Sequence, residues 1–254
     1  RGKALYSLAL GASVALIVGV PASRLVTALL DWRAIFGGIA ALLLAAFVAS
    51  ARTLPSTDGP PVAPLRKQLS YLANQRVLAV MASCTVMFIS YSMIFTYVAP
   101  YLSSVSSVLE AAIGWVLMGM GIASFVGSKL GGRLVGRIGA TRTLVAGTAL
   151  QASILALATL FPNSDIAAVA VLVTWILAAW LTGPTFNLSL IGAAPEASGI
   201  LLSLNTSAMQ LGFAGGAALG GAAISLWSVR SLTWLGALIV ALASVIGVAA
   251  ARSA

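Results

Sequence analysis

The chain has 254 residues, of which 60% are hydrophobic and 7% charged, and its mean hydropathy is +1.06. Soluble domains carry about 25% charged residues, so this composition excludes a water-soluble fold and predicts an integral membrane protein. The sequence contains no histidine, which excludes histidine-based acid–base and metal chemistry within these residues. It has one cysteine, Cys84, so no disulfide can form within the chain.

Eight apolar stretches have about the 20 residues that a helix needs to cross a bilayer. They cover residues 4–23, 34–51, 77–101, 112–131, 143–161, 166–191, 199–226 and 232–250. None alternates polar and apolar residues with the period of two that is typical of membrane β-strands. The predicted fold is therefore an all-α membrane protein, a polytopic bundle of eight transmembrane helices.

The net charge of +9 is distributed unevenly between the connections. If every predicted helix crosses the membrane, three basic residues lie on one side: Arg24, Arg33 and Arg230. The other eleven lie on the opposite side: Arg1, Lys3, Arg52, Arg66, Lys67, Arg76, Lys129, Arg133, Arg137, Arg142 and Arg252. Basic connections stay in the cytoplasm, so both ends of this chain are predicted to be cytoplasmic. The charge thus indicates topology, and no nucleic-acid partner is expected.

The segment 52–76 separates two predicted spans from six. It contains Pro55, Pro60, Pro61 and Pro64, which prevent a continuous helix and favour an extended linker. Residues 65–72 place three leucines on one helical face, which predicts a short amphipathic helix on the membrane; a solvated continuation of the linker is the alternative. The predicted domains are residues 1–51, the last two helices of an N-terminal half, the cytoplasmic linker 52–76, and a six-helix C-terminal half, 77–254.

Three predicted spans carry small residues at every fourth position, the spacing that lets membrane helices approach closely. The glycines in these rows are Gly11 and Gly19 in the first span, Gly119, Gly127 and Gly131 in the fourth, and Gly212, Gly216 and Gly220 in the seventh. The alternative is chance, because Gly and Ala are abundant throughout. Four or five small residues in register favour helix packing.

Five stretches together resemble the major facilitator superfamily, and more narrowly its bacterial drug-efflux and arabinose-efflux-like members. They are "GVP" at Gly19–Pro21 with "DWRAIF" at Asp31–Phe36, "TYVAPYL" at Thr96–Leu102, "GGRLVGRIG" after the fourth predicted span, and "LNTSAMQLGFAGGAALGG" at Leu204–Gly221. The resemblance implies helices five to twelve of a twelve-helix transporter. We therefore expect the chain to be a fragment that lacks four N-terminal helices. In that family, helices five, eight and eleven line the contact between the two halves, and these are the helices with the small-residue rows.

The resemblance also assigns a gating role to the connection after the fourth span. The residues concerned are Gly132, Arg133, Gly136, Arg137, Gly139 and Arg142. The family usually has an Asp where Gly136 stands, so this latch is expected to be weaker. A second departure is Val20, which separates Gly19 from Pro21 where the antiporter pattern has Gly-Pro adjacent. We expect Gly136 and Gly139 to let the chain turn tightly.

Substrate sites in such folds lie near the middle of the bilayer, so polar and aromatic residues at that depth are the candidates. They are Ser90, Tyr91, Phe95 and Tyr97 in the third span, Trp175, Trp180 and Asn187 in the sixth, and Asn205 and Gln210 in the seventh. A hydrogen bond between helices is an equally good interpretation for each of the three amides. None of these residues is charged, which favours a neutral, amphipathic or aromatic substrate.

These features favour a secondary transporter, a proton-coupled efflux permease for drugs, sugars or similar small molecules in a bacterial inner membrane. The expected partners are the small-molecule substrate, a coupling proton, the lipid bilayer and the missing N-terminal helices; no cofactor or metal is expected. An intramembrane enzyme is disfavoured because the chain lacks histidine and has no acid at bilayer depth. A non-transporting membrane scaffold or receptor with a degenerate transporter fold remains the alternative.

Overall fold

The computed structural model describes residues 26, 31–53, 73–161 and 163–252, and in these ranges the chain is helical with no strand. The elements in chain order are α3 (Trp32–Thr53), α5 (Gln75–Thr96), α6 (Val98–Val105), α7 (Ser107–Ile138), α8 (Ala140–Ala158), α9 (Asp165–Ala193), the 3-10 helix η3 (Pro195–Ala197), α10 (Ser198–Leu226) and α11 (Ser231–Arg252). The predicted span 4–23 with Gly11, Gly19 and Pro21, and the predicted amphipathic helix at 65–72, lie outside these ranges.

Seven of the described helices are long and apolar enough to cross a membrane: α3, α5, α7, α8, α9, α10 and α11. They correspond to the last seven of the eight predicted spans. The all-α, polytopic membrane fold is therefore confirmed.

Two helix boundaries differ from the prediction for a local reason. The span predicted to run to Tyr101 ends at Thr96, and the short helix α6 follows after Tyr97. Proline has no N–H and its ring clashes with the carbonyl four residues earlier. The break at Tyr97 places Pro100 in the first turn of α6, where neither problem arises.

The second difference concerns the predicted gating connection. The helix α7 continues to Ile138, so Gly132, Arg133, Gly136 and Arg137 are helical, and the expectation that Gly136 makes a turn is wrong. The turn is made by Gly139 alone. Its φ of 86° is readily adopted only by glycine, and α8 begins at the next residue.

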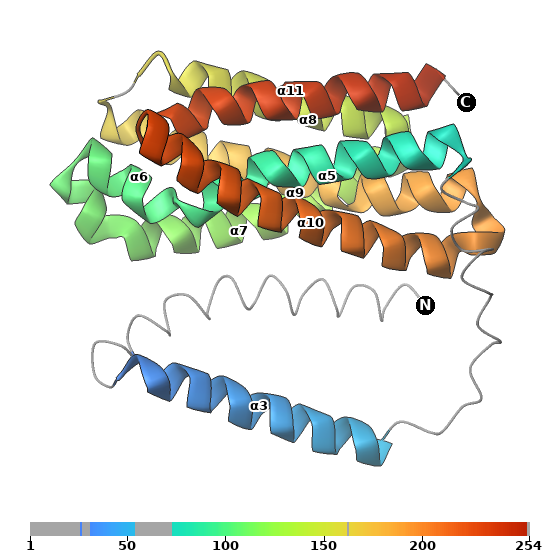
Figure 1. Ribbon diagram of the computed structural model, residues 1–254, viewed down its shortest axis with the longest axis horizontal. Helices are drawn as coiled ribbons and strands as arrows, with labels where there is room; N and C mark the ends of the chain where they lie inside the picture. The colour runs from blue at the N-terminus through green and yellow to red at the C-terminus, as the bar shows by residue number, and fades with distance from the viewer. Residues whose placement is uncertain (1–25, 27–30, 54–72, 162, 253–254) are drawn as a thin grey trace.

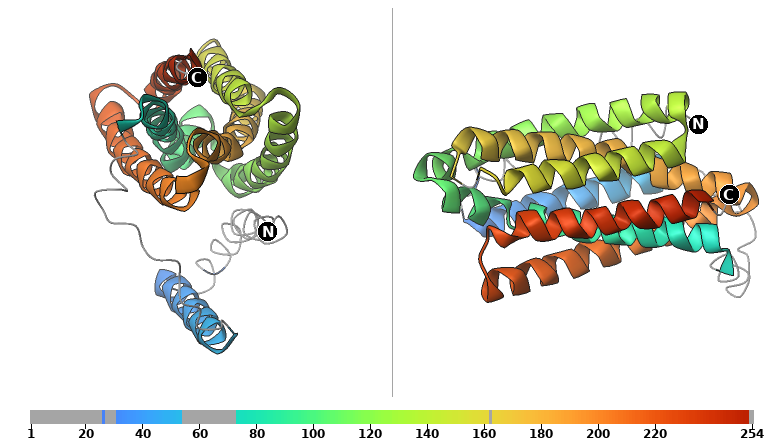
Figure 2. Two further views of the ribbon diagram at one scale, coloured as in Figure 1. Left: turned by 90° about the vertical axis from the view of Figure 1, so that its right-hand side faces the viewer. Right: turned by 90° about the horizontal axis from the view of Figure 1, so that it is seen from above.

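Six long helices form one bundle, shown end-on in Figure 2. The packed neighbours are, in order, α10 with α5, α5 with α11, α11 with α8, α8 with α9, and α9 with α7. The helices α7 and α10 thus stand at the two ends of an arc, and α5 and α9 contact one another across its inner side. The helix α3 buries none of its residues and lies apart from this bundle (Figure 1).

Glycines allow the closest helix contacts in the bundle. A Cβ atom on Gly127 would lie 3.0 Å from the carbonyl carbon of Leu177 in α9, and one on Gly131 would lie 2.8 Å from that of Leu181. On α10, a Cβ atom on Gly212 would lie 2.6 Å from a backbone oxygen of α5. These glycines therefore face neighbours inside the six-helix bundle, where they allow close helix contact as their spacing predicted.

Of the three remaining described glycines in these rows, Gly119 and Gly220 face side chains, and only Gly119 makes a loose contact. A Cβ atom on Gly119 would meet only Val173, at 3.9 Å, which is ordinary van der Waals contact. A Cβ atom on Gly220 would lie 2.7 Å from the ring of Tyr97. The backbone contact of α10 with α5 continues at Gly216, whose Cβ would press on the carbonyl of Ile89.

Candidate functional site

Seven aromatic side chains meet where α5, α9 and α10 face one another, and we refer to them as the aromatic cluster. They are Phe88, Tyr91 and Phe95 of α5, Trp175, Trp180 and Phe186 of α9, and Phe213 of α10. Tyr91 is at its centre. Its ring stacks on Phe95 at 5.4 Å between centroids, lies 5.4 Å from Trp175, and meets Phe213 edge-on at 5.7 Å.

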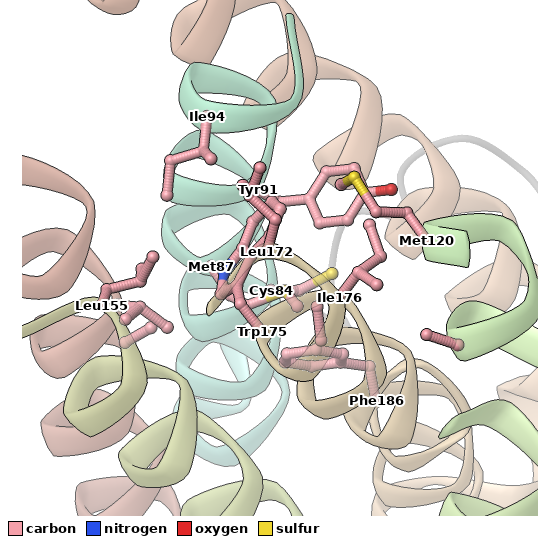
Figure 3. Packing of buried hydrophobic residues seen from close by; sticks show 14 of the residues in the cluster. Cys84, Met87, Tyr91, Ile94, Met120, Leu155, Leu172, Trp175, Ile176 and Phe186 are labelled. Carbon is pink, nitrogen blue, oxygen red and sulfur yellow. The ribbon is translucent and has the colours of Figure 1, made fainter. Parts of the chain in front are cut away.

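The helical repeat brings the α5 members of this cluster to one side. Phe88, Tyr91 and Phe95 follow at intervals of three and four residues, which places them on one face of the helix. Figure 3 shows the ring of Tyr91 extending from α5 on the side opposite Ile94 and Leu155. This face is therefore directed toward α9 and the inner side of the arc.

One side-chain hydrogen bond links the two principal helices of the cluster. The indole Nε1 of Trp180 donates to the hydroxyl oxygen of Tyr91 at 3.3 Å. Tyr91 and Trp175 are 4% and 0% exposed, whereas Trp180 and Phe95 are half-buried. Trp180 and Phe95 are thus the accessible candidates in this conformation, and Tyr91 and Trp175 form the wall behind them.

The indole Nε1 of Trp175 is buried and has no hydrogen-bond partner within the described residues. A buried donor without an acceptor costs about 1–3 kcal/mol. Because Trp175 is fully covered, a substrate could reach this donor only after the surrounding helices move.

Two other predicted substrate residues point elsewhere. The Ser90 hydroxyl donates to the backbone oxygen of Gly236 in α11 at 2.8 Å. The Tyr97 hydroxyl donates to the backbone oxygen of Ala217 in α10 at 3.0 Å. Both side chains therefore connect helices within the bundle, and the structure does not bring them to the aromatic cluster.

Of the three predicted amide side chains, Asn187 and Asn205 bond to each other and Gln210 lies on the surface of the bundle. The Asn205 Nδ2 donates to the Asn187 Oδ1 at 2.9 Å, a bond between α10 and α9. The Oδ1 of Asn205 is buried without a partner in the described part of the chain. Gln210 is exposed, and it lies on the far side of α10 from Gly212 because two residues turn a helix by about 200°.

Charged groups lie at the ends of the described helices. The basic residues Lys129, Arg133, Arg137 and Arg142 are exposed around the turn at Gly139. Among the acids, Glu110 and Asp165 lie in the first turns of α7 and α9, where a negative charge complements the helix dipole. Asp31 pairs with Arg33 at 3.2 Å just before α3. The aromatic cluster thus offers a substrate rings and single hydrogen-bond donors or acceptors.

Sequence reasoning missed Phe88, Phe186 and Phe213, which complete the cluster. The signal for Phe88 was present, since it lies three residues before Tyr91 on the same helical face. No local spacing relates Phe213 to α5, because that contact joins residues more than a hundred positions apart.

The described part of the chain is thus a bundle of apolar helices with an aromatic wall inside it and charged residues toward the helix ends. The model of the Major Facilitator Superfamily matches residues 1–214, and the chain belongs to that family. It is a multi-pass membrane protein, as the seven apolar helices indicate.

Curated relatives of this chain come from several bacteria. An uncharacterized MFS-type transporter, YbcL of Bacillus subtilis (strain 168), is 41% identical over 239 residues, which cover 94% of this chain and 61% of YbcL. The inner membrane transport protein YdhP of Escherichia coli (strain K12) is 27% identical, covering 89% of this chain and 58% of YdhP. A probable sugar efflux transporter of Mannheimia succiniciproducens is 26% identical, covering 94% and 60%. The chain therefore spans about three fifths of the length of these relatives.

Proposed function

We propose that this chain is part of a secondary transporter that exports small neutral molecules with aromatic or amphipathic character in exchange for protons. The observation that carries the proposal is the aromatic cluster, which lines the inner side of the arc with rings. The names of the relatives support transport, and one of them includes sugar efflux. The described carboxylates lie at helix ends, so the proposal places the proton-coupling group in helices outside the described residues.

The bundle 77–254 is, in this proposal, the C-terminal half of the transporter. Residues 1–51 belong to the N-terminal half together with four further helices, and 52–76 is the cytoplasmic linker. Three observations support this division. The chain covers 61% of YbcL, and α3 buries no residue against the bundle. The outer face of α10 supports it too, because it carries the exposed amide of Gln210. The Ser203 and Ser207 hydroxyls on the same face donate to backbone oxygens of α10 itself. Polar groups on a membrane helix favour contact with protein or water over lipid.

The distribution of basic residues supports a location in a bacterial inner membrane with the turn at Gly139 on the cytoplasmic side. Arg76 in the first turn of α5 and the four basic residues around that turn lie at one end of the bundle. The connection between α10 and α11 lies at the other end (Figure 1), and Arg230 belongs to this connection. This is the asymmetry that the positive-inside rule describes.

The test is flux into proteoliposomes that contain the complete gene product in which this chain occurs. Chloramphenicol, a neutral aromatic molecule, is compared with neutral arabinose and anionic benzoate, each with and without a pH gradient. We expect gradient-dependent flux of chloramphenicol, reduced at least tenfold in Trp180→Ala. The control is Trp115→Ala, because Trp115 is 73% exposed on α7 and outside the aromatic cluster.

Two results would contradict the proposal in different ways. Gradient-dependent flux of benzoate alone would overturn the substrate class and leave the transporter standing. If no solute shows flux under either condition, the scaffold interpretation is favoured. This result counts only when a thermal unfolding curve shows that the reconstituted protein is folded.

A further inference from the structure

A cavity of about 310 Å³, lined by polar and aromatic residues, opens at the end of the bundle that carries α6 and the α10–α11 connection. Its walls come from three separate parts of the chain: α6, the end of α8, and the α10–α11 connection together with the start of α11. The residues that give it its chemistry are Tyr101, Thr159, Trp227, Ser228, Arg230 and Trp234. None of the described residues that line it is acidic, so the cavity has a positive character.

Arg230 supplies the charge and is held in place by two hydrogen bonds. One guanidinium nitrogen donates to the Asn163 Oδ1 at 2.9 Å, and the other terminal nitrogen donates to the backbone oxygen of Ser104 at 3.1 Å. A guanidinium has five N–H donors in a planar fork that suits phosphate and carboxylate oxygens. Three donors therefore remain for a ligand, on a side chain whose position is already fixed.

Tyr101 provides a second donor to the same cavity. The residue as a whole is 8% exposed, and its hydroxyl makes no hydrogen bond within the described part of the chain. The hydroxyl oxygen is not one of the fully buried polar atoms, so it is accessible from the cavity and free to donate to a ligand there. The nearby guanidinium and this hydroxyl are together suited to an anionic oxygen.

An apolar groove of about 490 Å³ continues from this cavity between α8 and α11, and Thr159 and Trp234 line both spaces. The groove is open and apolar, and its lining consists largely of Ala152, Ala156, Ala237, Leu238 and Ala241. From Thr159 to Ala152, and from Trp234 to Ala241, the helices advance by about 10 Å. One leaflet of the hydrocarbon core is about 15 Å thick, so the groove reaches most of the way across a leaflet.

Two tryptophans mark the level of the membrane surface at the junction of cavity and groove. Trp227 and Trp234 are 62% and 41% exposed and meet edge-on at 5.9 Å. Tryptophan concentrates at the boundary between headgroups and acyl chains. The cavity is therefore at headgroup level and the groove at acyl-chain level.

We propose that the cavity and the groove together bind one anionic phospholipid. Its phosphate lies at Arg230 and the Tyr101 hydroxyl, and one acyl chain lies between α8 and α11. This assignment accounts for the charge, the accessible hydroxyl donor, and the apolar extension in a single ligand. A second copy of this chain is a poorer occupant, because symmetric pairing on this face would bring two Arg230 side chains together.

The test is native mass spectrometry of the detergent-purified gene product, titrated with dioleoyl phosphatidylglycerol. Arg230→Gln is expected to weaken binding of the first lipid about tenfold or more, because a hydrogen-bonded charge is lost. Tyr101→Phe is expected to weaken it a few-fold. Ala156→Phe, which fills the groove, is expected to weaken phosphatidylglycerol binding while leaving the headgroup cavity intact. Inorganic phosphate alone is expected to bind too weakly to compete.

Arg142→Gln is the matched control, since Arg142 is an exposed arginine at the opposite end of the bundle. Equal losses in Arg142→Gln and Arg230→Gln would reduce the effect to general surface charge and overturn the proposal. Full competition by inorganic phosphate would also overturn the proposal, because the ligand would then need no acyl chain. So would a change of oligomeric state in Ala156→Phe with unchanged lipid binding, because the groove would then be occupied by another protein copy. A variant is folded if its buried Cys84 thiol is protected from labelling. If Arg230→Gln does not fold, Arg230→Lys and Tyr101→Phe are the milder substitutions.

Discussion

The contact between α7 and α9 makes a quantitative prediction about one methyl group. Gly127→Ala places a Cβ atom 3.0 Å from the carbonyl carbon of Leu177 and 3.1 Å from its Cα, and closer still to its carbonyl oxygen. Carbon atoms prefer separations of about 3.5–4.0 Å, so the two helices must separate by at least about half an ångström. Backbone atoms cannot rotate away as a side chain can. Overpacking of this kind costs about 1–3 kcal/mol.

The control is Gly119→Ala, on the same helix and in the same row of small residues. Its new Cβ atom would meet only Val173 at 3.9 Å. Both substitutions gain the same helix propensity, about 1 kcal/mol, so the difference between the two variants isolates the packing cost. For a protein of this size, about 1–3 kcal/mol corresponds to a difference in Tm of roughly 2–12 °C.

The assay uses the only cysteine of the chain as its reporter. Cys84 is 0% exposed, so a thiol-reactive maleimide dye labels it only when the bundle opens. We expect Gly127→Ala to be labelled at a lower temperature than the unsubstituted protein, and Gly119→Ala at an equal or higher one. If Gly127→Ala unfolds at or above the temperature of Gly119→Ala, the close backbone contact between α7 and α9 does not exist.

Three further predictions follow from single contacts. Tyr91→Phe removes the acceptor of the Trp180 indole, and losing about 1 kcal/mol at this site raises the KM for export about fivefold; an unchanged KM would contradict a role for Trp180 in substrate contact. Asn187→Ala leaves the Asn205 amide without its partner and destabilises the protein by about 1–3 kcal/mol in the thiol assay, whereas Gln210→Ala changes stability by less than about 0.5 kcal/mol. Gly136→Asp fits without a clash, since no atom lies within 4 Å of its Cβ position, and is expected to change the transport rate; an unaltered rate would count against gating at this position.

Membrane helices are the feature that composition and run length determine almost alone. With 7% charged residues, the apolar stretches must lie in lipid or against other helices, and each long stretch satisfies its own backbone only as a helix. The seven described spans therefore lie where they were predicted, with ends set by local chemistry. Pro100 explains the early break after Thr96, and the positive φ of Gly139 explains the late end of α7.

The partner of each helix face was decided only in three dimensions. The spacing of Gly127, Gly131 and Gly212 indicated close contact, but spacing within one helix does not identify the helix that packs against it. The structure shows those contacts within the bundle, with α9 and α5. The same holds for the candidate substrate residues, of which only some lie together in the structure. Tyr91 and Trp180 meet, whereas Ser90 and Tyr97 bond to α11 and α10, because the rotation of each helix about its axis is set by its neighbours.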